Sequence, residues 1–97
     1  MRPITSDLSR EDERPYFLWD EDLSVRELRE ALLEGPDDTR RRLLAKVMRE
    51  ARDDEVWHFT KPDVVARELP ELAPWLGKRR AFWDFLITAW RQHGLVP

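Results

Sequence analysis

Apolar residues recur at helical spacing along this chain, and glycine, proline or the acidic pair Asp53-Asp54 ends each run. The runs cover residues 24–34, 43–51, 62–69 and 78–93, with a short apolar turn at 56–59. Apolar residues three or four positions apart fall on one face of an α-helix. No segment alternates apolar and polar residues as a half-buried strand does. The sequence therefore predicts an all-α fold, a compact bundle of about five helices.

Two segments carry the spacing of a helix start. Ser24 precedes Glu27 by three positions, and in such a capping box each side chain binds the backbone N–H of the other residue. Thr60 and Asp63 repeat this spacing. Proline lacks a backbone N–H and clashes with the carbonyl four residues before it, so Pro70 is predicted to end the third long helix.

The last predicted helix, residues 78–93, is apolar over most of its circumference. Trp83 and Ile87 are expected beside one apolar face, which consists of Ala81, Phe82, Phe85, Leu86, Ala89 and Trp90. Such a helix is either the centre of a bundle or half of an interface, so a homodimer is one alternative. Gly94 is expected to close this helix, and Gly35 to end the first one in the left-handed conformation.

The first 14 residues are polar and charged without an apolar period, which predicts a flexible arm at 1–14 followed by a single helical domain at 15–97. Four apolar residues, Tyr16–Trp19, come next and are bracketed by charge. One interpretation is an extended plug laid across the helical core. The other is an anchor for a partner, because Tyr and Trp are enriched at the energetic centres of interfaces.

Composition excludes several classes of function. The chain has no cysteine, which rules out disulfides, thiolate zinc sites and cysteine nucleophiles. His58 and His93 lack the short spacing of a metal-binding helix, so neither a metal nor a cofactor is expected. Seventeen basic and twenty acidic residues give a net charge of −3, whereas nucleic-acid-binding domains are usually basic. No window is apolar enough to span a membrane and no signal peptide is recognisable, so we expect a cytoplasmic protein.

One pair of residues has a spacing found in a family of enzymes. Arg52 and His58 stand with five residues between them. This is similar to the Arg-x(4–6)-His motif of helical ribonucleases of the HEPN superfamily. The resemblance implies that the arginine stabilises phosphate charge and the histidine acts as acid or base. Asp53, Asp54 and Glu55 between them would repel an RNA phosphate. The ribonuclease is therefore an alternative, and the main hypothesis has no catalytic residue.

Short basic runs occupy residues 40–42 and 78–80, each at the start of a predicted helix. The helix dipole disfavours cations there, so helix stability does not explain them. They form either a solvated face or a patch that faces a partner. A DNA-binding regulator is a second alternative, although the chain has no Asn and a single Gln for reading bases. The candidate partner-binding residues are Tyr16, Trp19, Arg41, Arg79 and Trp83.

Four segments together resemble a group of small bacterial helical proteins. These segments are Tyr16–Asp22, the helix at Leu43–Ala51, the turn at Asp54–Trp57 and the helix around Phe82–Trp83. Proteins of this group have no assigned function and are often encoded beside nucleotidyltransferase-like proteins related to abortive-infection toxins. The resemblance implies a non-catalytic interaction module, an antitoxin or accessory protein, that binds the neighbouring protein.

Overall fold

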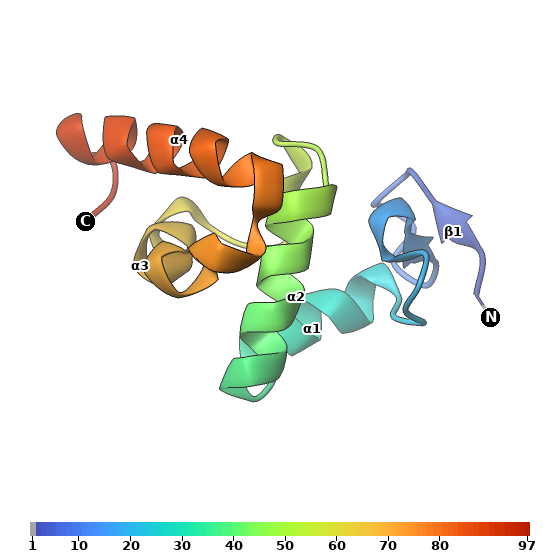
Figure 1. The fold of residues 1–97 in the computed structure, drawn as a ribbon. Helices are drawn as coiled ribbons and strands as arrows, with labels where there is room; N and C mark the ends of the chain where they lie inside the picture. The colour runs from blue at the N-terminus through green and yellow to red at the C-terminus, as the bar shows by residue number, and fades with distance from the viewer. Residues whose placement is uncertain (1) are drawn as a thin grey trace. The chain divides into compact units, whose positions relative to one another are not determined.

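The computed structural model describes residues 2–97 and is mostly helical (Figure 1). Its α-helices are α1 (Val25–Glu34), α2 (Asp37–Glu50), α3 (Pro62–Leu72) and α4 (Arg80–Gln92). Short 3₁₀ turns form η1 (Tyr16–Leu18), η2 (Glu55–His58), η3 (Ala73–Trp75) and η4 (Gly77–Arg79). Two parallel two-residue strands are β1 (Ile4–Thr5) and β2 (Arg14–Pro15). The predicted helical class is confirmed, but residues 2–97 contain four α-helices rather than about five, because the turn near Val56 is the 3₁₀ turn η2.

The chain divides into two compact units, of which the first ends at Leu44 and the second begins at Ala45. This division falls inside α2, so the helix contributes residues to both units. The sequence predicts a different division, with an arm at 1–14 and one helical domain at 15–97. Each unit is described below by itself.

In the first unit, the N-terminal segment is held against α1. Val25 and Arg26 are the first two residues of α1, and their N–H groups donate to the carbonyls of Glu13 and Glu11, respectively, at 3.0 and 3.1 Å. These amides have no partner within the helix, so the N-terminal segment caps α1. The sequence predicts a flexible arm at 1–14, of which residue 1 lies outside the described residues. The capping contacts join residues distant in sequence, which a local pattern of charges does not show.

Local contacts set both ends of α1. Ser24 Oγ accepts the N–H of Glu27 at 3.1 Å, and Glu27 Oε1 accepts the N–H of Ser24 at 2.9 Å, so the predicted capping box is confirmed. Gly35 follows the helix with a φ of −70°, so the predicted left-handed conformation is wrong. A Cβ on Gly35 would lie 2.6 Å from the carbonyl oxygen of Ala31. Glycine is needed here for a close approach of the backbone rather than for a positive φ.

The N-cap of α3 is Lys61, one residue after the predicted N-cap Thr60. Lys61 is the N-cap and makes no capping hydrogen bond with its side chain, so the predicted capping box of Thr60 and Asp63 is wrong. Pro62 occupies the first helical position, in the first turn as predicted. The fixed φ of proline suits that position, where a missing N–H has no effect.

The helix α3 continues past Pro70 to Leu72, so the prediction that this proline ends the helix is wrong. Pro70 cannot donate a hydrogen bond to the carbonyl of Ala66, four residues earlier. Arg91 of α4 takes this role, because its Nη2 donates to the Ala66 oxygen at 2.9 Å. Ala66 is 2% exposed, and a buried carbonyl needs such a partner. The hydrogen bond from Arg91 in α4 therefore allows α3 to continue through Pro70.

The helix α4 packs on α3 (Figure 1), and its fully buried residues are the two that the sequence places beside the apolar face. Trp83 and Ile87 are fully buried, whereas Phe85 is 74% exposed. The indole Nε1 of Trp83 donates to the carbonyl of Met48, close to the end of α2, at 2.9 Å. The last four carbonyls of a helix have no helical partner, so this contact caps α2 and sets the rotation of α4. Periodicity leaves that rotation open in a helix that is apolar on most sides.

Gly94 closes α4, as predicted. Its φ is +72°, and the N–H groups of Gly94 and Leu95 donate to the carbonyls of Arg91 and Trp90 at 3.1 and 2.9 Å. These two bonds define a Schellman motif. The chain then turns back, and the oxygen of Pro97 accepts a hydrogen bond from Nε of Arg91 at 2.8 Å.

Candidate functional site

Trp19 stands on a turn whose other side chains are largely buried. In η1, Phe17 and Leu18 are 3% and 0% exposed, whereas Trp19, the next residue, is 68% exposed. Tyr16 is half-buried, and its ring meets that of Phe17 edge-on with 5.3 Å between the centroids. Residues 16–19, here called the Trp19 turn, are thus the 3₁₀ turn η1 followed by its C-cap Trp19, and not the extended plug of the first interpretation. Two of its residues fill the interior and one faces outward.

A buried arginine holds this turn in place. Arg14 is 6% exposed, and its guanidinium donates Nη1 to the carbonyl of Trp19 and Nε to the carbonyl of Arg2, both at 2.9 Å. A buried charge is costly unless it is hydrogen-bonded, which favours this arrangement over others. The Arg14 guanidinium therefore fixes the backbone that carries the Trp19 side chain. Arg14 is not among the residues predicted from the sequence, because nothing local distinguishes it from the other arginines of the segment.

Ion pairs join the N-terminal segment to α1. Arg2 pairs with Glu27, and Arg29 donates Nη1 to Glu11 Oε1 at 2.6 Å. The backbone N–H of Ser24, and after it the Arg2 guanidinium, lower the pKa of Glu27. The hydrogen bond from Arg29 lowers the pKa of Glu11. All four charged side chains are partly exposed to solvent, so each pair alone contributes little to stability.

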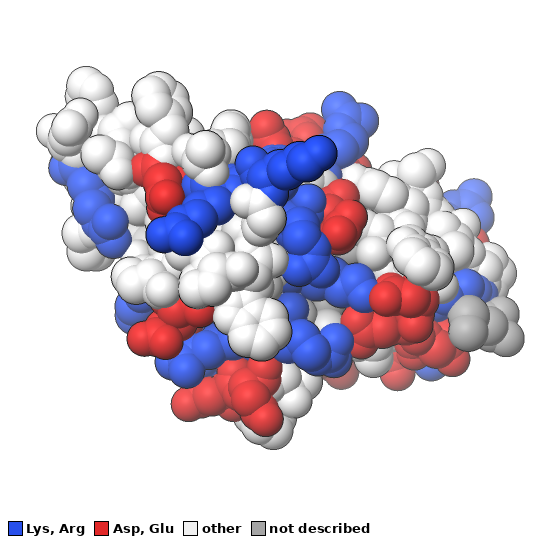
Figure 2. Space-filling model, viewed as in Figure 1, with Lys and Arg blue, Asp and Glu red and all other residues white. Residues whose placement is uncertain are grey.

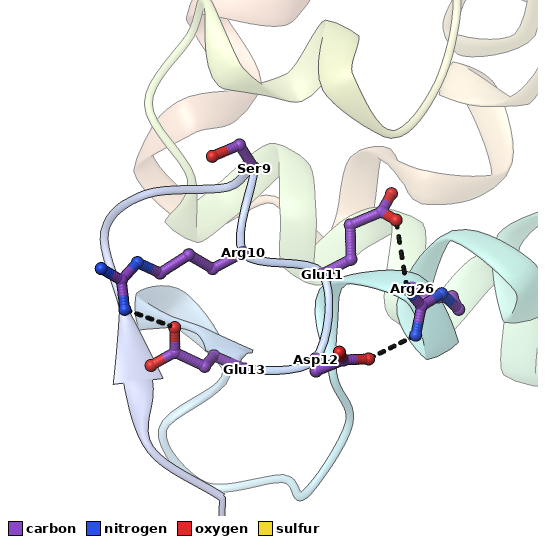
Figure 3. A pocket seen from close by; sticks show the side chains of 6 residues that line it. All are labelled: Ser9, Arg10, Glu11, Asp12, Glu13 and Arg26. Atoms are coloured by element: carbon purple, nitrogen blue, oxygen red, sulfur yellow. Dashed lines mark hydrogen bonds and ion pairs between the residues drawn. The ribbon is translucent and has the colours of Figure 1, made fainter.

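A polar pocket of about 340 Å³ lies in the same segment (Figure 3). Its lining consists of Ser9, Arg10, Glu11, Asp12, Glu13 and Arg26. Arg26 pairs with Glu11 at 3.3 Å and also with Asp12, and Arg10 pairs with Glu13 at 3.2 Å. Each charged side chain of this pocket has an opposite charge beside it. We therefore interpret the pocket as part of the attachment to α1.

The basic run at residues 40–42 is neutralised by nearby acids. Arg40 pairs with Asp37 at 3.1 Å, and Arg42 pairs with Glu21 at 3.0 Å. Arg41, a predicted contact residue, is half-buried and also has an interaction partner. Paired surface charges attract a polyanion less strongly than free ones.

The basic run at residues 78–80 is mostly paired as well. Arg79, another predicted contact residue, pairs with Asp53, and Arg80 pairs with Asp84 at 3.6 Å. Lys78 is exposed. The face drawn in Figure 2 carries both basic and acidic side chains. This arrangement fits the interpretation of a solvated face.

Trp83 is the predicted contact residue that the structure contradicts. It is 0% exposed, and its ring lies edge-on to those of Trp57 and Phe82, with centroids 5.8 and 5.0 Å away. The indole N–H is already bound to the carbonyl of Met48. Its size and its polar atom serve the interior of the second unit, so the side chain does not reach a partner.

Arg52 and His58, the residues of the ribonuclease alternative, are both exposed. Arg52 Nε lies 3.7 Å from a carboxylate oxygen of Asp54, which would compete with a phosphate. The ring of His58 meets that of Phe59 edge-on, with 5.2 Å between the centroids. These positions add no support to the ribonuclease alternative.

Two further aromatic side chains are exposed, Trp75 at 63% and Phe85 at 74%. Arg49 holds the first of them, because its Nη1 donates to the carbonyl of Trp75 at 2.9 Å. Pro74 and Gly77 mark an irregular corner in the sequence, which is a signal that the side chain between them can point outward. No local signal in the sequence predicts that Phe85 is exposed. Its exposure follows from the rotation of α4, which is set by the hydrogen bond from Trp83 to the carbonyl of Met48 in α2.

In residues 2–97, no group of three or more His, Cys, Asp or Glu side chains is arranged to hold a metal ion. Over the same range, no helix is both long and apolar enough to cross a membrane. Comparisons with protein-family models, with curated proteins and with solved structures give no match to this chain.

Proposed function

We propose that this chain is a non-catalytic module that binds a protein partner through the Trp19 turn. One observation carries the proposal: Trp19 is 68% exposed while the buried Arg14 holds its carbonyl. Tryptophan is enriched among the few residues that dominate binding energy at interfaces. A side chain on a backbone that is already held loses less conformational entropy on binding than one on a mobile loop.

The other candidate residues contribute unequally to this proposal. Tyr16 belongs to the same turn, and its ring is half-buried. Arg41 and Arg79 already have interaction partners, so we assign them at most a steering role at the rim of the interface. Trp83 is buried and takes no part.

The proposed partner is the nucleotidyltransferase-like protein of a two-gene module in the cytoplasm, with this chain as its antitoxin or accessory protein. The sequence resemblance described above supports this part of the proposal. Mechanistically, the Trp19 turn would cover a surface of the partner, and this chain would not turn over a substrate.

The test is binding of the purified chain to the protein encoded by the neighbouring gene. Trp19→Ala is expected to weaken the complex by about 2 kcal/mol, roughly 30-fold in Kd. Trp75→Ala removes a tryptophan of similar exposure outside the turn and is the matched control. Its Kd is expected to stay within about threefold of the original, a change below 1 kcal/mol.

Circular dichroism checks that both variants remain folded. Equal losses for the two variants, or no loss for Trp19→Ala, would show that the turn is not the binding site. If no neighbour-encoded protein associates at micromolar concentration, the proposed partner class is wrong.

A further inference from the structure

A second pocket, of about 290 Å³, lies where α3, α4 and the segment after α4 meet. Its lining consists of Asp63, Ala66, Arg67, Pro70, Arg91 and Pro97. The four residues from α3 are Asp63 and the residues three, four and seven positions after it, so they share one face of that helix. Ala66, Pro70 and Pro97 supply apolar walls. The other three side chains bring two positive charges and one negative charge to the same small space.

Asp63 and Arg67 differ from most charged residues of this chain. Neither side chain has an ion pair or hydrogen bond with another residue of the described range 2–97. They lie one helical turn apart, where an acid and a base can pair, and they do not pair. The polar pocket of Figure 3 is the opposite case, because its charges satisfy one another.

Arg91 is fixed at the edge of this pocket. Its Nε donates to the oxygen of Pro97 at 2.8 Å and its Nη2 to the oxygen of Ala66 at 2.9 Å. A guanidinium has five N–H donors, so donors remain after these two bonds. The pocket thus combines one positioned guanidinium with the unpaired guanidinium of Arg67 and the unpaired carboxylate of Asp63.

We propose that this pocket binds a small zwitterion of the amino-acid class with an apolar side chain. Arg67 and the remaining donors of Arg91 would bind the carboxylate, because guanidinium and carboxylate form paired, charge-assisted hydrogen bonds. Asp63 would bind the ammonium group, and Pro70 and Pro97 would contact the apolar side chain. The volume is close to the lower limit for ligand pockets, which suits a ligand of this size. The site lies in the second unit and does not depend on the Trp19 turn.

The test is a titration of the ¹⁵N-labelled full chain with L-leucine, followed by amide chemical shifts. We expect saturable shifts at Asp63, Ala66 and Arg67 with a Kd of about 1 mM. Leucine methyl ester lacks the carboxylate and N-acetyl-leucine lacks the ammonium group. Each is expected to bind about fivefold more weakly, the effect of one exposed ion pair. No saturation by about 50 mM leucine, or equal binding of either derivative, overturns the proposal.

Variants locate the site. Arg67→Gln and Asp63→Asn are each expected to raise the Kd for leucine about fivefold. Lys61→Gln and Glu71→Gln make the same charge changes at exposed residues of the same region outside the pocket, and are expected to leave the Kd within twofold, about 0.4 kcal/mol. If the controls weaken leucine binding as much as the pocket variants, binding reflects net charge and the proposed site is wrong.

Discussion

The contact between Arg91 and α3 leads to a quantitative prediction. Arg91→Met keeps a long side chain but removes the guanidinium that donates to the carbonyl of Ala66. Pro70 cannot replace that bond, because it has no N–H. A buried carbonyl without a partner costs about 1–3 kcal/mol, so the free energy of unfolding should fall by that amount. The variant also loses the bond to Pro97, which adds to the fall.

A second substitution separates these two losses. Pro70→Ala restores a backbone N–H that can donate to Ala66 in the ordinary helical pattern. In that background, Arg91→Met should cost less, because the Ala66 carbonyl keeps a partner. The bond to Pro97 is lost in both backgrounds and cancels in the comparison. The expected difference between the two costs is about 1–2 kcal/mol, which is within the range for directly coupled residues.

The assay is urea unfolding of the four proteins of this cycle, followed by far-UV circular dichroism. Free energies are compared only where the slope with urea is unchanged, since a changed slope indicates a different unfolded state. Arg67→Met is the control, because Arg67 lines the same pocket without a partner, and its cost should be the same in both backgrounds. If Arg91→Met costs the same in both backgrounds, within about 0.5 kcal/mol, the reasoning about Pro70 is refuted.

Three further predictions concern the ends of helices and the N-terminal segment. Trp83→Phe should destabilise the chain by about 1–3 kcal/mol, because it leaves a carbonyl of α2 without its partner; an unchanged melting temperature would contradict this. Gly35→Ala should lower the melting temperature, because its Cβ would lie 2.6 Å from the oxygen of Ala31, and a neutral result would show that the backbone relaxes freely. The pKa values of Glu27 and Glu11 are lowered in the folded chain, so their contribution is present above their ordinary value of 4.5 and is lost as the pH falls below it. Urea midpoints measured across that range test this. The Glu27→Gln, Glu11→Gln double variant should give a shallower profile than the original chain, with a remaining slope from Asp7, whose pKa is lowered by the hydrogen bonds from Ser9; equal slopes for the two proteins would contradict the prediction.

The candidate site was predictable only in part. An apolar run set between charges singled out Trp19, and Tyr16 beside it, from residue type and position alone. The same reasoning selected Trp83, because a tryptophan on a strongly apolar helix has the composition of an interface as well as of a core. The difference between Trp19 and Trp83 is burial, which depends on what packs against each ring. Arg14 could not be found in advance, because its role depends on two carbonyls that folding brings to it.

The sequence by itself determined features whose partners lie within about one helical turn. The capping box of Ser24 and Glu27, the first-turn position of Pro62 and the end of α4 at Gly94 are of this kind.

Tertiary structure alone decided the rest. It decided the passage of α3 through Pro70, the buried face of α4 and the attachment of the N-terminal segment to α1. Their key contacts join residues 25, 35 and 15 positions apart, namely Arg91 with Ala66, Trp83 with Met48, and Arg26 with Glu11. A backbone group that local structure leaves unpaired can be satisfied by any donor that folding brings within reach, and local sequence does not identify that donor.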